Sequence, residues 1–232
     1  MSNFKTTIEN IDWNNLRDAF TSQESLFGKA EEKFQLLAHW SKAIETIYSD
    51  NIALPFIREA QISSQDFFCS CSLALYKCSA SSIRTIFESV LYFSYFKDHV
   101  KELDSVVKRN LYMSRASLID YHINHTDSFE SLYTETNLKS ELESIYKEVS
   151  SIVHGQKPGT WHSTHKLENR QFEERIAVEA VNLYCRTIDV INLLLLCTIS
   201  YSEWITISPI SRKFIIATLK EDQIKLIDKH VI

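Results

Sequence analysis

The stretch from Ser81 to Glu102, SSIRTIFESVLYFSYFKDHVKE, most restricts how this chain can fold. Read at helical spacing, it places one apolar stripe along a helix, formed by Ile83, Ile86, Phe87, Val90, Leu91 and Ser94. A second stripe beside it, at i, i+4 and i+8, consists of Arg84, Glu88 and Tyr92. Because an isolated buried charge costs several kcal/mol, the arginine and the glutamate need partners. We therefore expect a central helix whose polar stripe is met by residues from elsewhere in the chain.

The rest of the chain offers little material for tight turns, since its 232 residues include three glycines and three prolines. This scarcity favours long helices over a sandwich or a barrel. Amphipathic helices are expected over Ser25–Ser49, Leu138–Val153 and Glu168–Tyr201, and Pro55 can open another. The prediction is an all-α, single-domain bundle of about six or seven helices. Its core covers 25–200, with an arm or short helix over 1–23 and a C-terminal helical segment over 209–232.

The breaks between these helices are predicted from capping residues. The serines of Cys78–Ser82 are good N-caps, so a turn or kink there would start the central helix. Helical character then continues over Leu103–His125, while 129–136 fits either a helix or a loop. Pro209 interrupts the pattern, and Ser211 can cap a last helix that runs through Lys229.

Charge and cysteine usage limit the class of protein. The net charge of −5 argues against a generally basic nucleic-acid binder but leaves room for a local basic patch. The longest apolar run, Val190–Tyr201, is shorter than the roughly 20 residues of a membrane span, so we expect a buried helix end and no membrane. No signal peptide is evident. Reduced cysteines in a cytoplasmic protein are predicted, because none shows C-x-x-C spacing: Cys69, Cys71, Cys78, Cys185 and Cys197.

The most unusual local sequence follows the helix that ends near Val153. Lys147, Ser151 and His154 share a helix face, and Ser150 lies one turn before His154. A histidine beside a lysine and hydroxyls could bind a phosphate and move a proton near neutral pH. It could equally be an exposed helix end whose histidine meets the C-terminal dipole. Gly155 is placed to end the helix in the left-handed conformation.

These two segments together carry a resemblance. IRTIFESVLYFSYFKDH, followed by YKEVSSIVHG, resembles the pattern of bacterial all-α proteins of the HEPN superfamily, over roughly residues 65–156. The matching residues are Arg84, Glu88, Tyr92, Ser150, Val153, His154 and Gly155. The resemblance implies a helical bundle, commonly a homodimer with two sites across a shared cleft. It also implies a metal-independent ribonuclease of a toxin–antitoxin or anti-phage system, or a non-catalytic RNA-binding or scaffold module.

The sequence departs from the superfamily's catalytic signature, which is an arginine, four to six residues and a histidine. Lys147 stands at the allowed spacing before His154, and lysine lacks the bidentate grip of arginine on phosphate. Arg84 could supply the guanidinium from the neighbouring helix. A literal match, Arg115-x6-His122, is the second-ranked site.

In the enzyme interpretation no cofactor is needed. His154 would exchange a proton with the ribose 2′-hydroxyl or the leaving 5′-oxygen, while Arg84 and Lys147 stabilise charge on the phosphate. Glu88 would hold Arg84, and substrate contacts would come from Tyr92, Ser150, Ser151 and Trp161. In the competing interpretation, Arg84–Glu88 is an ion pair that ties His154 to the core of an interaction module. RNA, a second copy of the chain and an inhibitory or activating partner protein are the expected partners.

The loop after His154 leaves two further alternatives open. His154, His162 and His165 suggest zinc, but no cysteine or carboxylate pair completes a convincing site, and no metal is predicted. Trp161 could stack on a base, or it could anchor the loop to the body of the protein.

Overall fold

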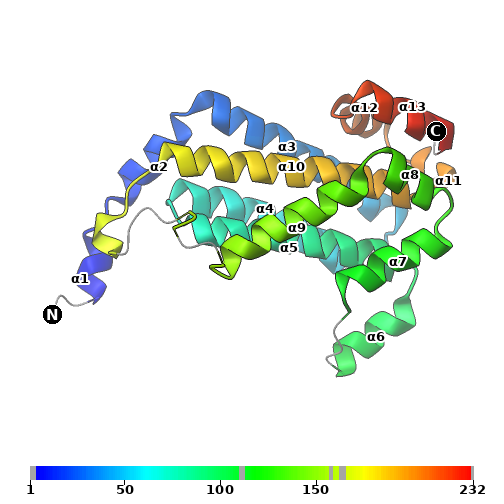
Figure 1. Ribbon diagram of the computed structural model, residues 1–232, viewed down its shortest axis with the longest axis horizontal. Helices are drawn as coiled ribbons and strands as arrows, with labels where there is room; N and C mark the ends of the chain where they lie inside the picture. Colours follow the sequence, from blue (N-terminus) through cyan, green and yellow to red (C-terminus); the bar gives the residue numbers. More distant parts are fainter. Residues whose placement is uncertain (1–3, 110–112, 157–158, 162–165, 231–232) are drawn as a thin grey trace.

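The computed structural model of the protein describes residues 4–109, 113–156, 159–161 and 166–230. Within these ranges it is all-α, without a strand, which confirms the predicted fold class (Figure 1). The helices are α1 (Phe4–Glu9), α2 (Trp13–Thr21), α3 (Glu24–Ile47), α4 (Leu54–Ser72), α5 (Tyr76–Phe96), α6 (Val100–Arg109), α7 (Arg115–His125), α8 (Phe129–Glu135), α9 (Leu138–Val153), α10 (Glu174–Thr198), α11 (Tyr201–Trp204), α12 (Pro209–Ala217) and α13 (Glu221–His230), with a 3₁₀ turn at Leu167–Asn169. They are more numerous than the predicted six or seven.

The core of the molecule is the bundle of α3, α4, α5, α9 and α10, whose axes run side by side (Figure 1). α5 packs against α4, α9 and α10, which confirms its predicted central position. α9 has the predicted bounds, and its stripe of Leu142, Ile145 and Val149 is buried. Burying each such side chain contributes about 1.5–3 kcal/mol, so the α5–α9 contact holds the two segments of interest together.

The turn that starts α5 lies earlier in the chain than the capping serines suggest. α4 ends at Ser72, and Ala74 adopts a left-handed φ of 53° before α5 begins at Tyr76. The Leu75 N–H donates to Ser70 O at 2.7 Å and closes this turn. The prediction of a break at Cys78–Ser82 is therefore wrong. Its serines are inside α5, where Ser82 bonds back to the carbonyl of the preceding turn, as helical serines can.

Two other regions divide into shorter helices. Leu103–His125 is not continuous, because Ser114 caps a new helix by accepting from the Ser117 N–H. The undecided segment 129–136 is helical as α8. Near the C-terminus, Ser208 rather than Ser211 is the cap, and Pro209 occupies the first turn of α12, where its missing N–H costs least.

α10 is long and apolar enough to span a membrane by length and composition alone, yet 78% of that stretch is buried inside the protein. The run from Val190 to Ile199 is wholly buried, so its interpretation as part of a buried helix is confirmed. This burial is compatible with a soluble protein. All five cysteines are free, as expected, although Cys69 and Cys78 are exposed rather than in the core.

Candidate functional site

α5 presents the polar stripe of Arg84, Glu88 and Tyr92 toward the edge of α9. Arg84 Nε donates to Glu88 Oε1 at 2.8 Å, and the two side chains keep 24% and 37% of their surface exposed. A pair this exposed at i, i+4 stabilises a helix by about 0.5 kcal/mol or less. Its main consequence is geometric, since Glu88 fixes the orientation of the Arg84 guanidinium.

α9 delivers His154 to this guanidinium through the way the helix ends. His154 is the C-cap residue, and Gly155 follows with a left-handed φ of 65°. The Gly155 N–H donates to Ile152 O at 3.1 Å, and the Gln156 N–H donates to Ser151 O at 2.9 Å. This is a Schellman turn, and it supports the predicted role of Gly155. The turn directs the chain away from α9 and leaves the imidazole exposed beside α5.

The decisive contact joins Arg84 Nη1 and His154 Nε2 at 2.7 Å, across 70 residues of sequence. A guanidinium can only donate hydrogen bonds, so Nε2 is the acceptor and the ring proton resides on Nδ1. The arrangement holds the imidazole by one nitrogen at the surface. The geometry places His154 against the arginine–glutamate stripe, as expected.

Two residues that the sequence reasoning did not place here complete the surroundings. The Tyr146 ring has Arg84 Cζ 5.6 Å from its centroid and Arg115 Cζ 4.6 Å from it, both within the range of cation–π attraction. Arg115 comes from the first turn of α7, so three helices supply this cluster. Tyr146 lies two turns before His154 and one before Ser150. Helical spacing along α9 is therefore the signal that could have found it.

Next to the cluster is a shallow depression of about 10 Å³, lined in part by Glu88, Tyr92, Arg115 and Tyr146. The Tyr92 hydroxyl donates to Met113 O at 3.5 Å, which ties α5 to the segment before α7. The depression is too small for a nucleotide. Any larger ligand would therefore lie across the surface rather than inside the depression.

The candidate site residues of α9 differ in how far they are buried. Lys147 is exposed and makes no ion pair with another described residue. Ser151 is buried, and its hydroxyl donates to Glu148 O at 2.7 Å, so it does not reach the His154 surface. The Ser150 oxygen is buried without a hydrogen-bond partner among the described residues. Buried hydroxyl groups normally form hydrogen bonds, so Ser150 is an exception among the polar residues of α9.

The second-ranked pair, Arg115 and His122, does not form one site. His122 is 1% exposed, with Nε2 3.0 Å from Ser94 Oγ and Nδ1 2.8 Å from Thr126 Oγ1. Burial lowers the pKa of His122 to about 4, aided by the nearby charge of Lys97. A histidine enclosed in the core cannot reach a polymer substrate, so this assignment is corrected: Arg115 belongs with Tyr146 and His122 with the core.

Of the candidate residues in the loop after His154, the structure describes Trp161. Trp161 is 4% exposed, and its Nε1 donates to Glu179 Oε2 on α10 at 3.1 Å. This geometry fits the anchoring interpretation and leaves no open ring face for a base. His162 and His165 lie outside the described residues. Within the described part of the chain, no three histidine, cysteine or acidic side chains are grouped as metal ligands.

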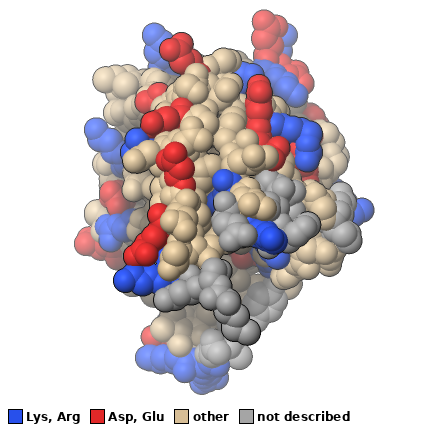
Figure 2. All heavy atoms as spheres, turned by 90° about the vertical axis from the view of Figure 1, so that its left-hand side faces the viewer, with Lys and Arg blue, Asp and Glu red and all other residues tan. Residues whose placement is uncertain are grey.

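The end of the molecule where α9 terminates carries mixed charge (Figure 2). Lysine and arginine side chains lie near the middle of this face, and a strip of acidic side chains runs beside them. Neither sign of charge dominates this face, as the net charge of −5 would lead one to expect. An anionic polymer would therefore be bound locally rather than over a broad basic surface.

Comparisons with family models, curated proteins and solved structures give no match to this chain. The HEPN resemblance thus stays a prediction that rests on the two short motifs. What the structure adds is their contact in space, through Arg84 and His154.

Proposed function

We propose that the protein is a HEPN-like, metal-independent endoribonuclease of the cytoplasm that acts as a toxin or anti-phage defence effector. The observation that supports this proposal is the 2.7 Å contact between the exposed His154 imidazole and Arg84. A proton-transfer group and a phosphate-binding group are thereby held together at the surface, and Arg115 contacts the same Tyr146 ring as Arg84. Such a group pair is what cleavage of RNA by its own 2′-hydroxyl requires.

The reaction follows from the resting contact. Arg84 turns one of its N–H groups from His154 to the scissile phosphate, which frees the Nε2 lone pair. Nε2 then takes the proton of the ribose 2′-hydroxyl, and the 2′-oxygen attacks phosphorus. The bond to the 5′-oxygen breaks, and that oxygen receives a proton from the imidazolium or water. The products are a 2′,3′-cyclic phosphate and a 5′-hydroxyl, and Arg84 stabilises the pentacoordinate phosphorane between them.

The neighbouring residues have supporting roles in this proposal. Glu88 holds Arg84 by its Nε, and Nη1 of the same guanidinium contacts His154. Lys147 and Arg115 attract the flanking phosphates, and a second copy of the chain would place a second site across a shared cleft. An effector of this kind needs restraint, so a partner protein that covers His154 is part of the proposal.

A second candidate, a non-catalytic helical interaction module, is favoured by a different observation. Arg84 is bonded to both Glu88 and His154, and the adjoining depression holds only about 10 Å³. If the hydrogen bonds of Arg84 are all made within the protein, they stabilise the contact between α5 and α9 without any substrate. The two candidates differ in whether His154 is needed for chemistry or for stability.

The test uses purified full-length protein with mixed RNA in EDTA. We expect cleavage with cyclic phosphate ends, loss of at least about a hundredfold in rate for His154→Ala, and a similar loss for Arg84→Gln. His125→Ala, another exposed histidine at a helix end, is the matched control and should retain the rate. Cleavage that survives His154→Ala refutes the site. Absence of cleavage, together with a lowered Tm in His154→Ala, favours the interaction module.

A further inference from the structure

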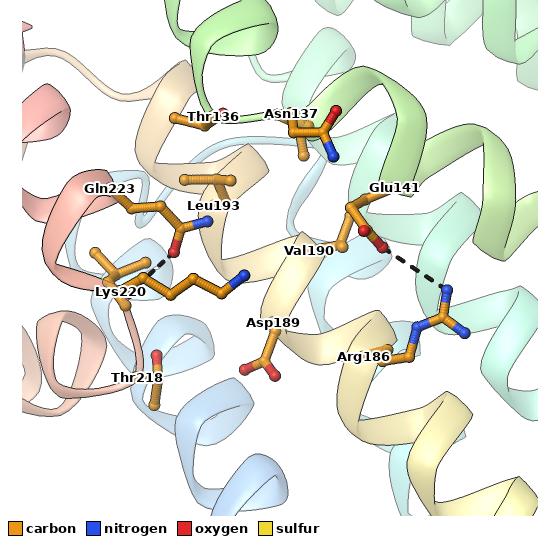
Figure 3. Close-up of a pocket in the computed structure, with 12 residues that line it drawn as sticks. Thr136, Asn137, Glu141, Arg186, Asp189, Val190, Leu193, Thr218, Lys220 and Gln223 are labelled. Carbon is orange, nitrogen blue, oxygen red and sulfur yellow. Dashed lines mark hydrogen bonds and ion pairs between the residues drawn. The ribbon is translucent and has the colours of Figure 1, made fainter.

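At the opposite end of α9, a cavity of about 270 Å³ lies between the α8–α9 junction, α10 and α13 (Figure 3). Its volume is just below the usual range of about 300–1,000 Å³ for small-molecule sites, and it cannot admit a polymer. α9 is about 24 Å long at 1.5 Å per residue, so this cavity is well separated from His154. It belongs to neither the proposed RNA site nor its surroundings.

Two amide side chains direct their nitrogens into the cavity because their oxygens are already occupied. Gln223 Oε1 accepts from the Lys220 backbone N–H at 3.0 Å. Asn137 Oδ1 accepts from Ser140 Oγ at 2.7 Å. Figure 3 shows both amide nitrogens facing the space between α9 and α13. No described residue accepts a hydrogen bond from either nitrogen.

A positive charge faces the same space. The Lys220 side chain extends into the cavity, and its ammonium makes no ion pair with the described residues (Figure 3). α9 begins here at Asn137 without a side-chain cap, and the acidic side chain in its first turn is Glu141. Three donors therefore face the cavity, Asn137 from the start of α9 and Lys220 and Gln223 from the α13 side, and together they favour an oxyanion between them (Figure 3).

Carboxylates line the cavity as well. Asp189 of α10 faces the cavity, with one oxygen bonded to Lys33 Nζ at 2.7 Å. Glu141, in the first turn of α9, also lines the cavity, and its Oε2 lies 3.7 Å from Arg186 Nη2. A ligand that was only anionic would meet these carboxylates. A ligand with an amine at its other end would bond to them instead.

We propose that this cavity binds a small zwitterion, whose carboxylate or phosphate contacts Lys220, Asn137 and Gln223 and whose amine contacts Asp189. An amino acid and a phosphorylated amine share this chemistry. Because the ligand would bridge α9 and α13, its binding would hold the C-terminal helices on the bundle.

The experiment is a thermal shift and calorimetric titration of the full chain with individual amino acids, O-phosphoserine, phosphoethanolamine and inorganic phosphate. A zwitterion at about a hundredfold excess over its Kd should raise the Tm by about 5 °C or more. Amino acids binding best would identify the carboxylate as the anionic group, and the phosphorylated amines binding best would identify a phosphate. Inorganic phosphate acting as well as any zwitterion would overturn the role of Asp189.

Variants locate the binding. Lys220→Met and Gln223→Glu, both at accessible positions on or next to α13, should each weaken it tenfold or more. Lys225→Met, an exposed lysine on the same helix, should bind as the wild type does. Circular dichroism checks that all three fold. The proposal is overturned if none of the probes binds the wild type, or if binding is equal in Lys220→Met and Gln223→Glu.

Discussion

The buried histidine of α7 provides the sharpest test of how charges are arranged in this protein. His122 is 1% exposed and bonded on both ring nitrogens, to Ser94 and Thr126. Burial lowers its pKa to about 4, whereas an unfolded histidine titrates near 6.5. Between these values the unfolded chain binds more protons than the folded one. Stability is therefore lost as the pH falls below about 6.5, and the loss is complete below about 4.

The size of the effect follows from the two pKa values. At about pH 5 the cost is about 2 kcal/mol relative to about pH 8, and the limit at lower pH is about 3 kcal/mol. Replacing His122 by Gln removes the titration and keeps a side chain able to bond to Ser94. The variant will be less stable at pH 8. Its stability should nevertheless fall by about 2 kcal/mol less than that of the wild type between pH 8 and pH 5.

Urea unfolding at several pH values, followed by circular dichroism, measures this difference directly. Comparing the variant with the wild type cancels the contribution of the other titrating groups. Parallel curves for the two proteins would refute the reasoning, because His122 would then have the same proton affinity folded and unfolded. The same variant should retain any RNA cleavage. Its loss in a well-folded His122→Gln protein would restore Arg115-x6-His122 as the site.

Three other substitutions probe separate parts of the structure. Arg115→Gln should leave the Tm nearly unchanged. Because one phosphate contact is lost, the slope of log K for single-stranded RNA against log salt, measured by fluorescence titration, should become smaller by about 0.7. An unchanged slope would mean that Arg115 is not part of the binding surface. Asn192→Leu leaves the buried Trp40 N–H without its acceptor, which lies at 2.6 Å in the wild type. The free energy of unfolding, measured with urea, should fall by about 3 kcal/mol. A fall of less than about 1 kcal/mol would mean that the core repacks around the substitution. Trp161→Phe removes the hydrogen bond to Glu179 and should lower the free energy of unfolding by about 1 kcal/mol in the same assay, without changing the affinity for RNA. Weaker RNA binding by this variant would favour stacking of Trp161 on a base.

Local periodicity was sufficient to predict the fold class and several helices of this protein. The bounds of α9 match the pattern because an asparagine precedes it and a glycine follows it, both of which mark helix ends. Short helices were harder to predict. The turn at Ala74 has no glycine or proline, and its left-handed conformation is imposed by the packing of α4 on α5. Tertiary packing of this kind cannot be predicted from a single stretch of sequence.

The candidate site was predictable to the extent that its residues share helix faces. Arg84 and Glu88 are neighbours by spacing, and the end of α9 was marked by Gly155. The position of Arg115 was not predictable, because it depends on how α7 packs on α5 and brings a guanidinium onto Tyr146. The burial of His122 was missed for a related reason. Its bonding partner Ser94 belongs to α5, which is distant in sequence.

The dependence on two helices also constrains how such a site can work. α9 has 16 residues, a length at which an isolated helix is marginal in water, so His154 has a defined position only when α9 is packed on α5. Arg84 is held in turn by Glu88 on α5 itself. His154 and Arg84 therefore come from opposite sides of one apolar interface. A partner protein or a second copy that shifted α9 along α5 would change the contact between Arg84 and His154 without touching either residue.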